Sequence, residues 1–371
     1  RRGMRVILDG VFNHCGSFNK WLDAEQIYER SGDYAPGAFV SKDSPYHTFF
    51  QFRDESDEAW PYNRSYDGWW GHDTLPELNY ESSKKLEEYI LCIARKWVSP
   101  PYSVDGWRLD VAADLGHTAE YNHVFWKKFR AAVKEANPNA VILAEHYGDP
   151  SSWLQGDQWD SVMNYDAFME PVTWFLTGME KHSDSYNSSL WGSGESFFES
   201  MRYHMSRMQT NTVLTAMNQL SNHDHSRFLT RTNRIVGRTA TVGPEKASEN
   251  VQVCVLREAV VIQMTWPGAP TLYYGDEAGV CGWTDPDSRR TYPWGKENLE
   301  LIEFHRYLTG LRRRYPVFRR GALKPLFAGR HQIAYGRMEG KYQAVIAVSN
   351  CPEPQSMEIP VWQLGITDDM I

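Results

Sequence analysis

The sequence predicts an α/β fold in which a parallel sheet is connected by crossover helices. Two observations support this prediction. Short apolar runs end at a charged residue, as in Val104 to Asp110 and Ala140 to Glu145, which is typical of buried parallel strands. Stretches with helical apolar spacing lie between or after these runs, and such alternation of strand and helix indicates a parallel sheet.

Six segments are short and apolar enough to be strands of this sheet. They are residues 4–9, 104–110, 140–145, 161–164, 215–220 and 269–274. Helices are expected where apolar residues recur every three or four positions, because such spacing forms one buried stripe. These segments are residues 86–97, 124–133, 197–208, 251–264 and 299–311.

The spacing of these elements predicts the domain organisation. Residues 1–316 form the strand-and-helix domain, and residues 15–80 within it form an inserted subdomain, because the stretch is too long for a plain loop. After the helix at 299–311, residues 332–335 and 342–348 are strand-like with no helix between them. We therefore expect a C-terminal β-domain over residues 317–371, and we expect it to be truncated because no closing strand is evident.

Composition excludes several classes of partner. A net charge of −8 and a pI near 5.9 argue against nucleic acid, whose binding needs clustered Lys and Arg. No run of 18 apolar residues could span a membrane. The five cysteines are scattered without a CxxC pair, so neither a disulfide framework nor a zinc site is expected. Aromatic residues make up 14% of the chain and offer flat faces for core packing or for sugar rings.

Three acidic residues lie at or just beyond predicted strand ends: Asp110, Glu145 and Asp224. In a parallel α/β barrel the carboxyl ends of the strands form one rim, so these carboxylates could converge there. A retaining glycosidase needs two carboxyl groups about 5 Å apart. Arg108 points to the same face of its strand as Asp110, and its charge would keep that carboxylate ionised. One such acidic residue is usually a solvated or helix-capping group, and it is the joint pattern that indicates chemistry.

The pattern resembles the α-amylase family, glycoside hydrolase family 13. Six segments in the family's order carry the resemblance, which extends from Met4 to about Val348. The segments are Asp9–His14, Leu75–Asn79, Gly106–Asp110, Ala144–Glu145, Asn222–Asp224, and Gly268–Pro270 through Tyr274–Glu277.

The resemblance implies a TIM (β/α)8 barrel. In the family the motif seen at Asp9–His14 lies on the third strand, so the chain would supply strands three to eight and lack the first two. A barrel without two strands exposes unpaired edges, so we expect the chain alone to be poorly stable and the activity to belong to a full-length parent.

The resemblance also implies the catalytic roles. Asp110 would be the nucleophile, and Glu145 would be the acid that protonates the leaving oxygen and later the base that activates water. Asp224 would be the third carboxylate, which holds the distorted sugar through its hydroxyl groups. His223 and Arg108 would assist at the same sugar.

Five further residues are candidate substrate contacts. His14 is expected to contact the cleavage-site sugar as in the family, whereas Asn13 could instead shape its loop. Trp70 follows Trp69 and could stack on glucose or pack the inserted subdomain. His146 and Tyr147 follow Glu145 and are candidates for the leaving-side sugar.

Substrate and cofactor are expected from the same resemblance. The substrate would be an α-glucan oligosaccharide, and residues 285–290 with 292–294 resemble neopullulanase-like and oligo-α-glucosidase members. The preference between α-1,4 and α-1,6 bonds, and between hydrolysis and transglycosylation, stays open. No cofactor is required. Calcium is common in the family, and Asn13 is a candidate ligand, but no acidic loop of metal-binding spacing is evident. A homodimer of the full-length parent stays open.

Two other classes of protein compete with a glycosidase. A catalytically silent barrel that serves binding or assembly would not need Asp110, Glu145 and Asp224 together. A phosphate-binding α/β barrel would need a glycine-rich phosphate loop at a final strand, and the sequence has none.

Overall fold

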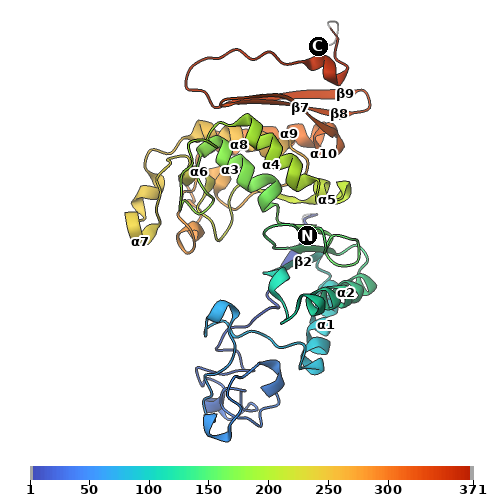
Figure 1. Ribbon diagram of the computed structural model, residues 1–371, viewed down its shortest axis with the longest axis vertical. Helices are drawn as coiled ribbons and strands as arrows, with labels where there is room; N and C mark the ends of the chain where they lie inside the picture. The colour runs from blue at the N-terminus through green and yellow to red at the C-terminus, as the bar shows by residue number, and fades with distance from the viewer. Residues whose placement is uncertain (1–2, 368–371) are drawn as a thin grey trace. The chain divides into compact units, whose positions relative to one another are not determined.

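The computed structural model describes residues 3–367 and divides into two compact units (Figure 1). The first unit extends to His146 and includes Pro150–Val162. The second unit comprises Tyr147–Asp149 and the chain from Met163 onward. Each unit has its own sheet and its own helices.

The first unit is built on a four-stranded parallel sheet. Its strands are β1 (Ile7–Gly10), β2 (Gly106–Leu109), β3 (Val141–Ala144) and β4 (Ser161–Val162), in the order β1-β2-β3-β4. Asp9 pairs with Arg108, and Arg108 pairs with Leu143, so the strands are closely in register. Because the strands are parallel, their carboxyl ends lie at one edge, and Asp110 and Glu145 follow β2 and β3 directly at that edge.

Two amphipathic helices accompany this sheet and pack against each other: α1 (Lys84–Val98) and α2 (Ala119–Ala136). Ser83 caps α1 by accepting a hydrogen bond from the Leu86 amide, and Thr118 caps α2 by accepting one from Tyr121. The buried face of α2 is largely aromatic, with Phe125, Trp126 and Phe129. The spacing of these residues explains why the helical periodicity of the sequence located both helices.

The segment at residues 15–80 contains short 3-10 turns and isolated bridges, and no α-helix or strand is assigned to it. Buried aromatic residues, among them Phe39, Phe49 and Phe52, stabilise it. One of its 3-10 turns, Trp69–Gly71, carries the Trp pair that the sequence singled out. The expected domain bounds, 15–80 included, remain predictions.

The second unit contains two sheets and most of the helices. Its parallel pair is β5 (Met217–Gln219) and β6 (Ala269–Thr271), and its antiparallel sheet, drawn in red in Figure 1, has the order β7 (Ala322–Gly329), β8 (Gln332–Glu339), β9 (Tyr342–Ser349). The helices are α3 (Glu170–Thr177), α4 (Gly194–Met205), α5 (Thr210–Thr215), α6 (Phe228–Arg231), α7 (Thr239–Val242), α8 (Val253–Thr265), α9 (Leu299–Arg314) and α10 (Val317–Arg320). Phe228, Trp266 and Tyr335 belong to the apolar core of this unit.

All six strands expected in the parallel part are present at the predicted places, although each is shorter than its apolar run. The helices α1, α2, α4, α8 and α9 match predicted segments, whereas α3, the short helices α5, α6, α7 and α10, and strand β7 were not expected. Within residues 3–367, no helix is long and apolar enough to cross a membrane. All five cysteines are free thiols in that part of the chain, and Cys92 and Cys254 are exposed.

Candidate active site

Arg108 is the centre of the polar cluster at the edge of the first sheet. Its Nη1 donates to Asp9 Oδ1 at 2.8 Å and to Asp110 Oδ1 at 2.7 Å, and its Nη2 lies 2.8 Å from Glu145 Oε2. Burial would lower the pKa of Arg108, but Glu145 and Asp9 outweigh it and raise the pKa above the ordinary value. One guanidinium therefore links carboxylates that come from three neighbouring strands.

The turn after Asp110 has a strained backbone. Val111 adopts φ 37° and ψ 48°, a left-handed conformation that is uncommon for a β-branched residue. In this conformation the Val111 amide donates to Glu145 Oε2 at 3.1 Å. Strained residues of this kind concentrate at functional sites. An amide of the turn that follows Asp110 thus holds the Glu145 side chain in place.

Asn13 and His14 are buried beside this cluster. Asn13 Nδ2 and His14 Nδ1 lie 3.3 Å apart, and the His14 ring stacks on Trp69. Burial lowers the pKa of His14, while the charge of Asp110 opposes this shift. At neutral pH the ring is therefore uncharged and can accept or donate a hydrogen bond.

The sequence proposed two alternatives for the Trp69–Trp70 pair, and the structure separates the two residues. Trp69 is packed, because its Nε1 donates to Asp114 Oδ2 at 2.9 Å and its ring lies against His14. Trp70 is 79% exposed. His146 packs against Trp153, with ring centroids 5.0 Å apart.

The second unit holds Asp224 and His223 on the turn after β5. His223 Nε2 lies 3.4 Å from Asp224 Oδ2, and Arg289 Nη2 lies 3.8 Å from Asp224 Oδ1. Asn222 shapes the turn, since its Oδ1 accepts the amides of Asp224 and His225 at 3.0 Å each. The Asp224 side chain is 38% exposed and remains open to solvent.

Tyr147 belongs to the second unit, although it lies only two residues after Glu145. Its hydroxyl lies 3.0 Å from His225 Nε2, and its ring stacks on Tyr165 with centroids 4.1 Å apart. Burial, together with nearby cations that include Arg231 and Lys181, lowers the pKa of His225 well below its usual value. The partner of the Tyr147 hydroxyl is therefore a neutral imidazole.

Comparison with known proteins decides the family. The model of the alpha amylase catalytic domain matches residues 1–313 of this chain. The chain belongs to the α-amylase family. Asp110, Glu145 and Asp224 all lie within the residues that this family model matches.

Several members of the family resemble this chain over most of its length. Neopullulanase 2 of Thermoactinomyces vulgaris is 33% identical over 370 residues, which cover 98% of this chain and 54% of that protein. An amylopullulanase of Thermoanaerobacter thermohydrosulfuricus is 32% identical over 365 residues, covering 91% of this chain and 23% of that protein. The crystal structure of a debranching enzyme from Nostoc punctiforme superposes with a TM-score of 0.74 at 29% identity, covering 93% of this chain and 65% of that one.

The fold class predicted from the sequence, the α/β barrel class of α-amylase catalytic domains, is thereby confirmed. The chain spans between about a fifth and half of the length of the curated relatives that it matches. The structure brings Asp110, Glu145 and Arg108 together in one unit and places Asp224, His223 and Tyr147 in the other. The roles of these residues remain predictions.

Calcium, which the sequence left as an option for this family member, finds little support at Asn13. Asn13 Oδ1 is a buried oxygen without a hydrogen-bond partner among the described residues. Ca²⁺, however, takes six to eight oxygens. One amide oxygen does not form such a set, so we assign no step of the chemistry to a metal.

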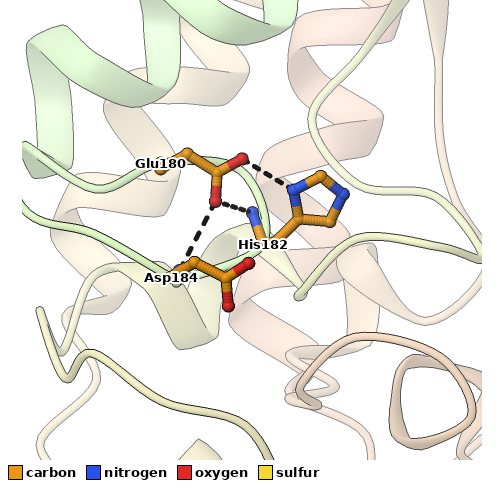
Figure 2. Close-up of side chains that lie close together, drawn as sticks. All are labelled: Glu180, His182 and Asp184. Atoms are coloured by element: carbon orange, nitrogen blue, oxygen red, sulfur yellow. Dashed lines mark hydrogen bonds and ion pairs between the residues drawn. The ribbon is translucent and has the colours of Figure 1, made fainter.

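Within residues 3–367, one group of three potential metal ligands was found, and it lies in the second unit (Figure 2). It comprises Glu180, His182 and Asp184. Glu180 Oε1 already contacts His182 Nδ1 at 2.7 Å, and its Oε2 accepts the His182 amide at 2.7 Å. Asp184 pairs with Arg238. These contacts outweigh burial and lower the pKa of Glu180 to about 2, so the group is a satisfied network of ion pairs and hydrogen bonds.

Some contacts of this family member's site were not predicted from the sequence. Asp9 belonged to the first motif without a role of its own, and it forms an ion pair with Arg108. Arg289 belongs to the segment 285–290, for which no individual residue was given a role, and it lies beside Asp224. Pairing across neighbouring strands and loop proximity produce these contacts, and neither is encoded in local spacing.

Proposed function

We propose that the protein is a retaining glycoside hydrolase that cleaves α-glucosidic bonds in malto-oligosaccharides, dextrins or starch-like glucans. The observation that carries the proposal is the Arg108 guanidinium, whose terminal nitrogens contact Asp110 and Glu145 at 2.7 and 2.8 Å. A retaining glycosidase needs its two carboxyl groups roughly 5 to 5.5 Å apart, and carboxyl groups that contact one guanidinium lie near each other. The names of the relatives support the same substrate class.

In the first step an oxygen of Asp110 attacks the anomeric carbon, and the bond from that carbon to the leaving oxygen breaks. Glu145 gives its proton to the leaving oxygen, which departs as a free hydroxyl group. The negative charge of Asp110 favours a proton on Glu145 at this stage. Arg108 holds Asp110 in place for the attack by donating to its Oδ1 at 2.7 Å.

In the second step Glu145 accepts a proton from water, and the water oxygen displaces Asp110 from the sugar. Esterified Asp110 is neutral, so its repulsion of a negative Glu145 is gone and Arg108 favours the ionised base. Two displacements at one carbon retain its configuration. Asp224 and His223 would hold the hydroxyl groups of the same sugar.

The bond preference is a finer part of the proposal. Pullulan-degrading relatives favour an enzyme that accepts α-1,6 as well as α-1,4 bonds. Transglycosylation is the alternative outcome, in which a sugar hydroxyl replaces water. Product analysis on maltotriose, pullulan and cyclodextrin separates these activities, and light scattering of the full-length parent tests whether it is a homodimer.

The Glu145→Gln variant tests the acid directly. Gln cannot protonate a leaving oxygen, so we expect turnover of maltotriose to fall by about 10³-fold. An activated aryl glycoside, whose leaving group needs no proton, should lose far less in the glycosylation step. Pre-steady-state release of the aryl group measures that step. Equal losses on both substrates would exclude Glu145 as the acid.

A further inference from the structure

Three aromatic rings form a stacked column in the first unit. The His14 and Trp69 ring centroids are 5.1 Å apart with 16° between their planes, and those of Trp69 and Trp70 are 4.9 Å apart with 26°. His14 is buried near the charge of Asp110, whereas Trp70 is exposed. The column therefore leads from the surroundings of Asp110 to solvent, and the Trp70 ring lies within about 10 Å of the His14 ring.

The middle ring of the column is held firmly. Trp69 donates from its ring nitrogen to Asp114, and its amide donates to the Leu75 carbonyl at 2.9 Å. Gly68 makes this turn feasible, because a Cβ there would lie 2.2 Å from the His72 carbonyl oxygen. Trp69 thus provides a fixed base for the ring stacked on it.

Trp70 combines two unfavourable properties. Its backbone is left-handed, with φ 51° and ψ 26°, which is rarely adopted by a bulky residue. Its indole is exposed, so burial of apolar surface does not offset that strain. A single exposed aromatic residue is ordinary, but one presented by a strained turn on a stacked base is not accounted for by the fold.

We infer that Trp70 is a remote platform on which one glucose unit of a longer α-glucan stacks, so that the residue selects substrates by chain length. The apolar C–H face of a glucose ring fits an indole face, and its hydroxyl groups remain in water. The inference rests on the proposed function, since it assumes that the sugar chain is cleaved at Asp110. A substrate reaches Trp70 only if its chain extends far enough from the cleavage site along the column, so the longest substrates should depend on Trp70 most.

The test is the Trp70→Asn variant, because Asn tolerates the left-handed conformation and removes the ring. We measure kcat and KM on a ladder from maltotriose to maltoheptaose. The shortest substrate should be unaffected within twofold, and kcat/KM for the longest should fall about tenfold, mostly through KM. Trp70→Phe should restore most of the loss.

Trp362 provides a matched control, since it is 72% exposed on a 3-10 turn of the second unit. Trp362→Ala should show no dependence on chain length. An equal loss on every substrate for Trp70→Asn, or no loss on any, would overturn the inference, as would a change of oligomeric state in light scattering.

The two proposals fail differently. An inactive wild-type protein would contradict the proposed hydrolase, whereas the ratio of variant to wild type along the ladder reports on the platform. Calorimetric titration of maltoheptaose into Asp110→Asn, with and without Trp70→Asn, measures the platform without turnover. Equal affinity of these two proteins would also exclude a sugar at Trp70.

Discussion

The candidate catalytic carboxylates of the two units differ in how firmly their surroundings hold them. The Asp110 and Glu145 side chains are 20% and 6% exposed, and each contacts Arg108 within 2.8 Å. Asp224 is 38% exposed, and its ion pairs with His223 and Arg289 are 3.4 and 3.8 Å long. Arg289 makes its shorter contact, at 2.6 Å, with Asp285.

This difference indicates that the two groups of carboxylates are held in place to different degrees. Charges that are shielded from water interact strongly, so the Arg108 cluster fixes its carboxylates before a ligand arrives. A charge that is open to water is screened, and its geometry depends on what binds. The first unit would thus supply preformed chemistry, and Asp224 would gain its partners from the hydroxyl groups of the substrate.

The largest effect is expected at Asp110. In Asp110→Asn the amide can still accept from Arg108, but it is a poor nucleophile, so kcat should fall by about 10⁴-fold, or about 5.5 kcal/mol. Rates on maltotriose measure the loss. Circular dichroism and maltoheptaose binding should remain close to wild type. Turnover like that of the wild type would refute the nucleophile assignment.

Substitution of Arg108 and of Arg289 compares the surroundings of the carboxylates in the two units directly. Arg108→Met leaves Asp9, Asp110 and Glu145 without their shared cation, so the free energy of unfolding should fall by about 3 kcal/mol. The matched control, Arg289→Met, removes a half-exposed cation and should change it by less than about 0.5 kcal/mol. Urea unfolding measures both, and similar losses would remove the distinction between the units.

Glu258 tests whether the exposure of a carboxylate, rather than the unit that contains it, determines how much its charge destabilises the folded protein. It lies on α8 in the second unit, its Oε2 has no hydrogen-bond partner among the described residues, and burial raises its pKa from 4.5 to about 7. The folded state therefore binds this proton more tightly than the unfolded state does. The resulting stability is complete below about pH 4.5 and is lost as the pH rises through about 7.

The Glu258→Gln variant should abolish this pH dependence. Above pH 8 it should be more stable than the wild type by about 2 to 3 kcal/mol, since no buried charge forms. Urea unfolding at several pH values gives the comparison. Parallel stability profiles of the two proteins would show that the carboxyl group is hydrated in the folded state.

The sequence predicted those elements whose burial pattern is regular. The apolar runs that end at Asp110 and Glu145 are strands, and the stripes of α1, α2, α8 and α9 are helices. It missed α3, which follows a wide π-turn at Tyr165–Met169 and has Pro171 in its first turn. It also missed β7, where the register shifts between Pro325 and Phe327 and interrupts the alternation.

The contacts of the candidate site likewise fall into those that the sequence could predict and those that it could not. The contact between Arg108 and Asp110 follows from the two-residue period of one strand, so the sequence could predict it. The contacts of Arg108 with Asp9 and Glu145 depend on which strands are neighbours and on their register. The separate surroundings of Trp69 and Trp70 depend on one left-handed residue, which local composition does not encode.

The left-handed Val111 has a consequence for directed evolution of this protein. Its conformation costs roughly 1 to 2 kcal/mol, which glycine at the same position would largely recover. A screen for heat tolerance would therefore favour substitutions in this turn. The same turn presents the amide that holds Glu145, so variants selected for survival at high temperature should be screened for turnover at each round.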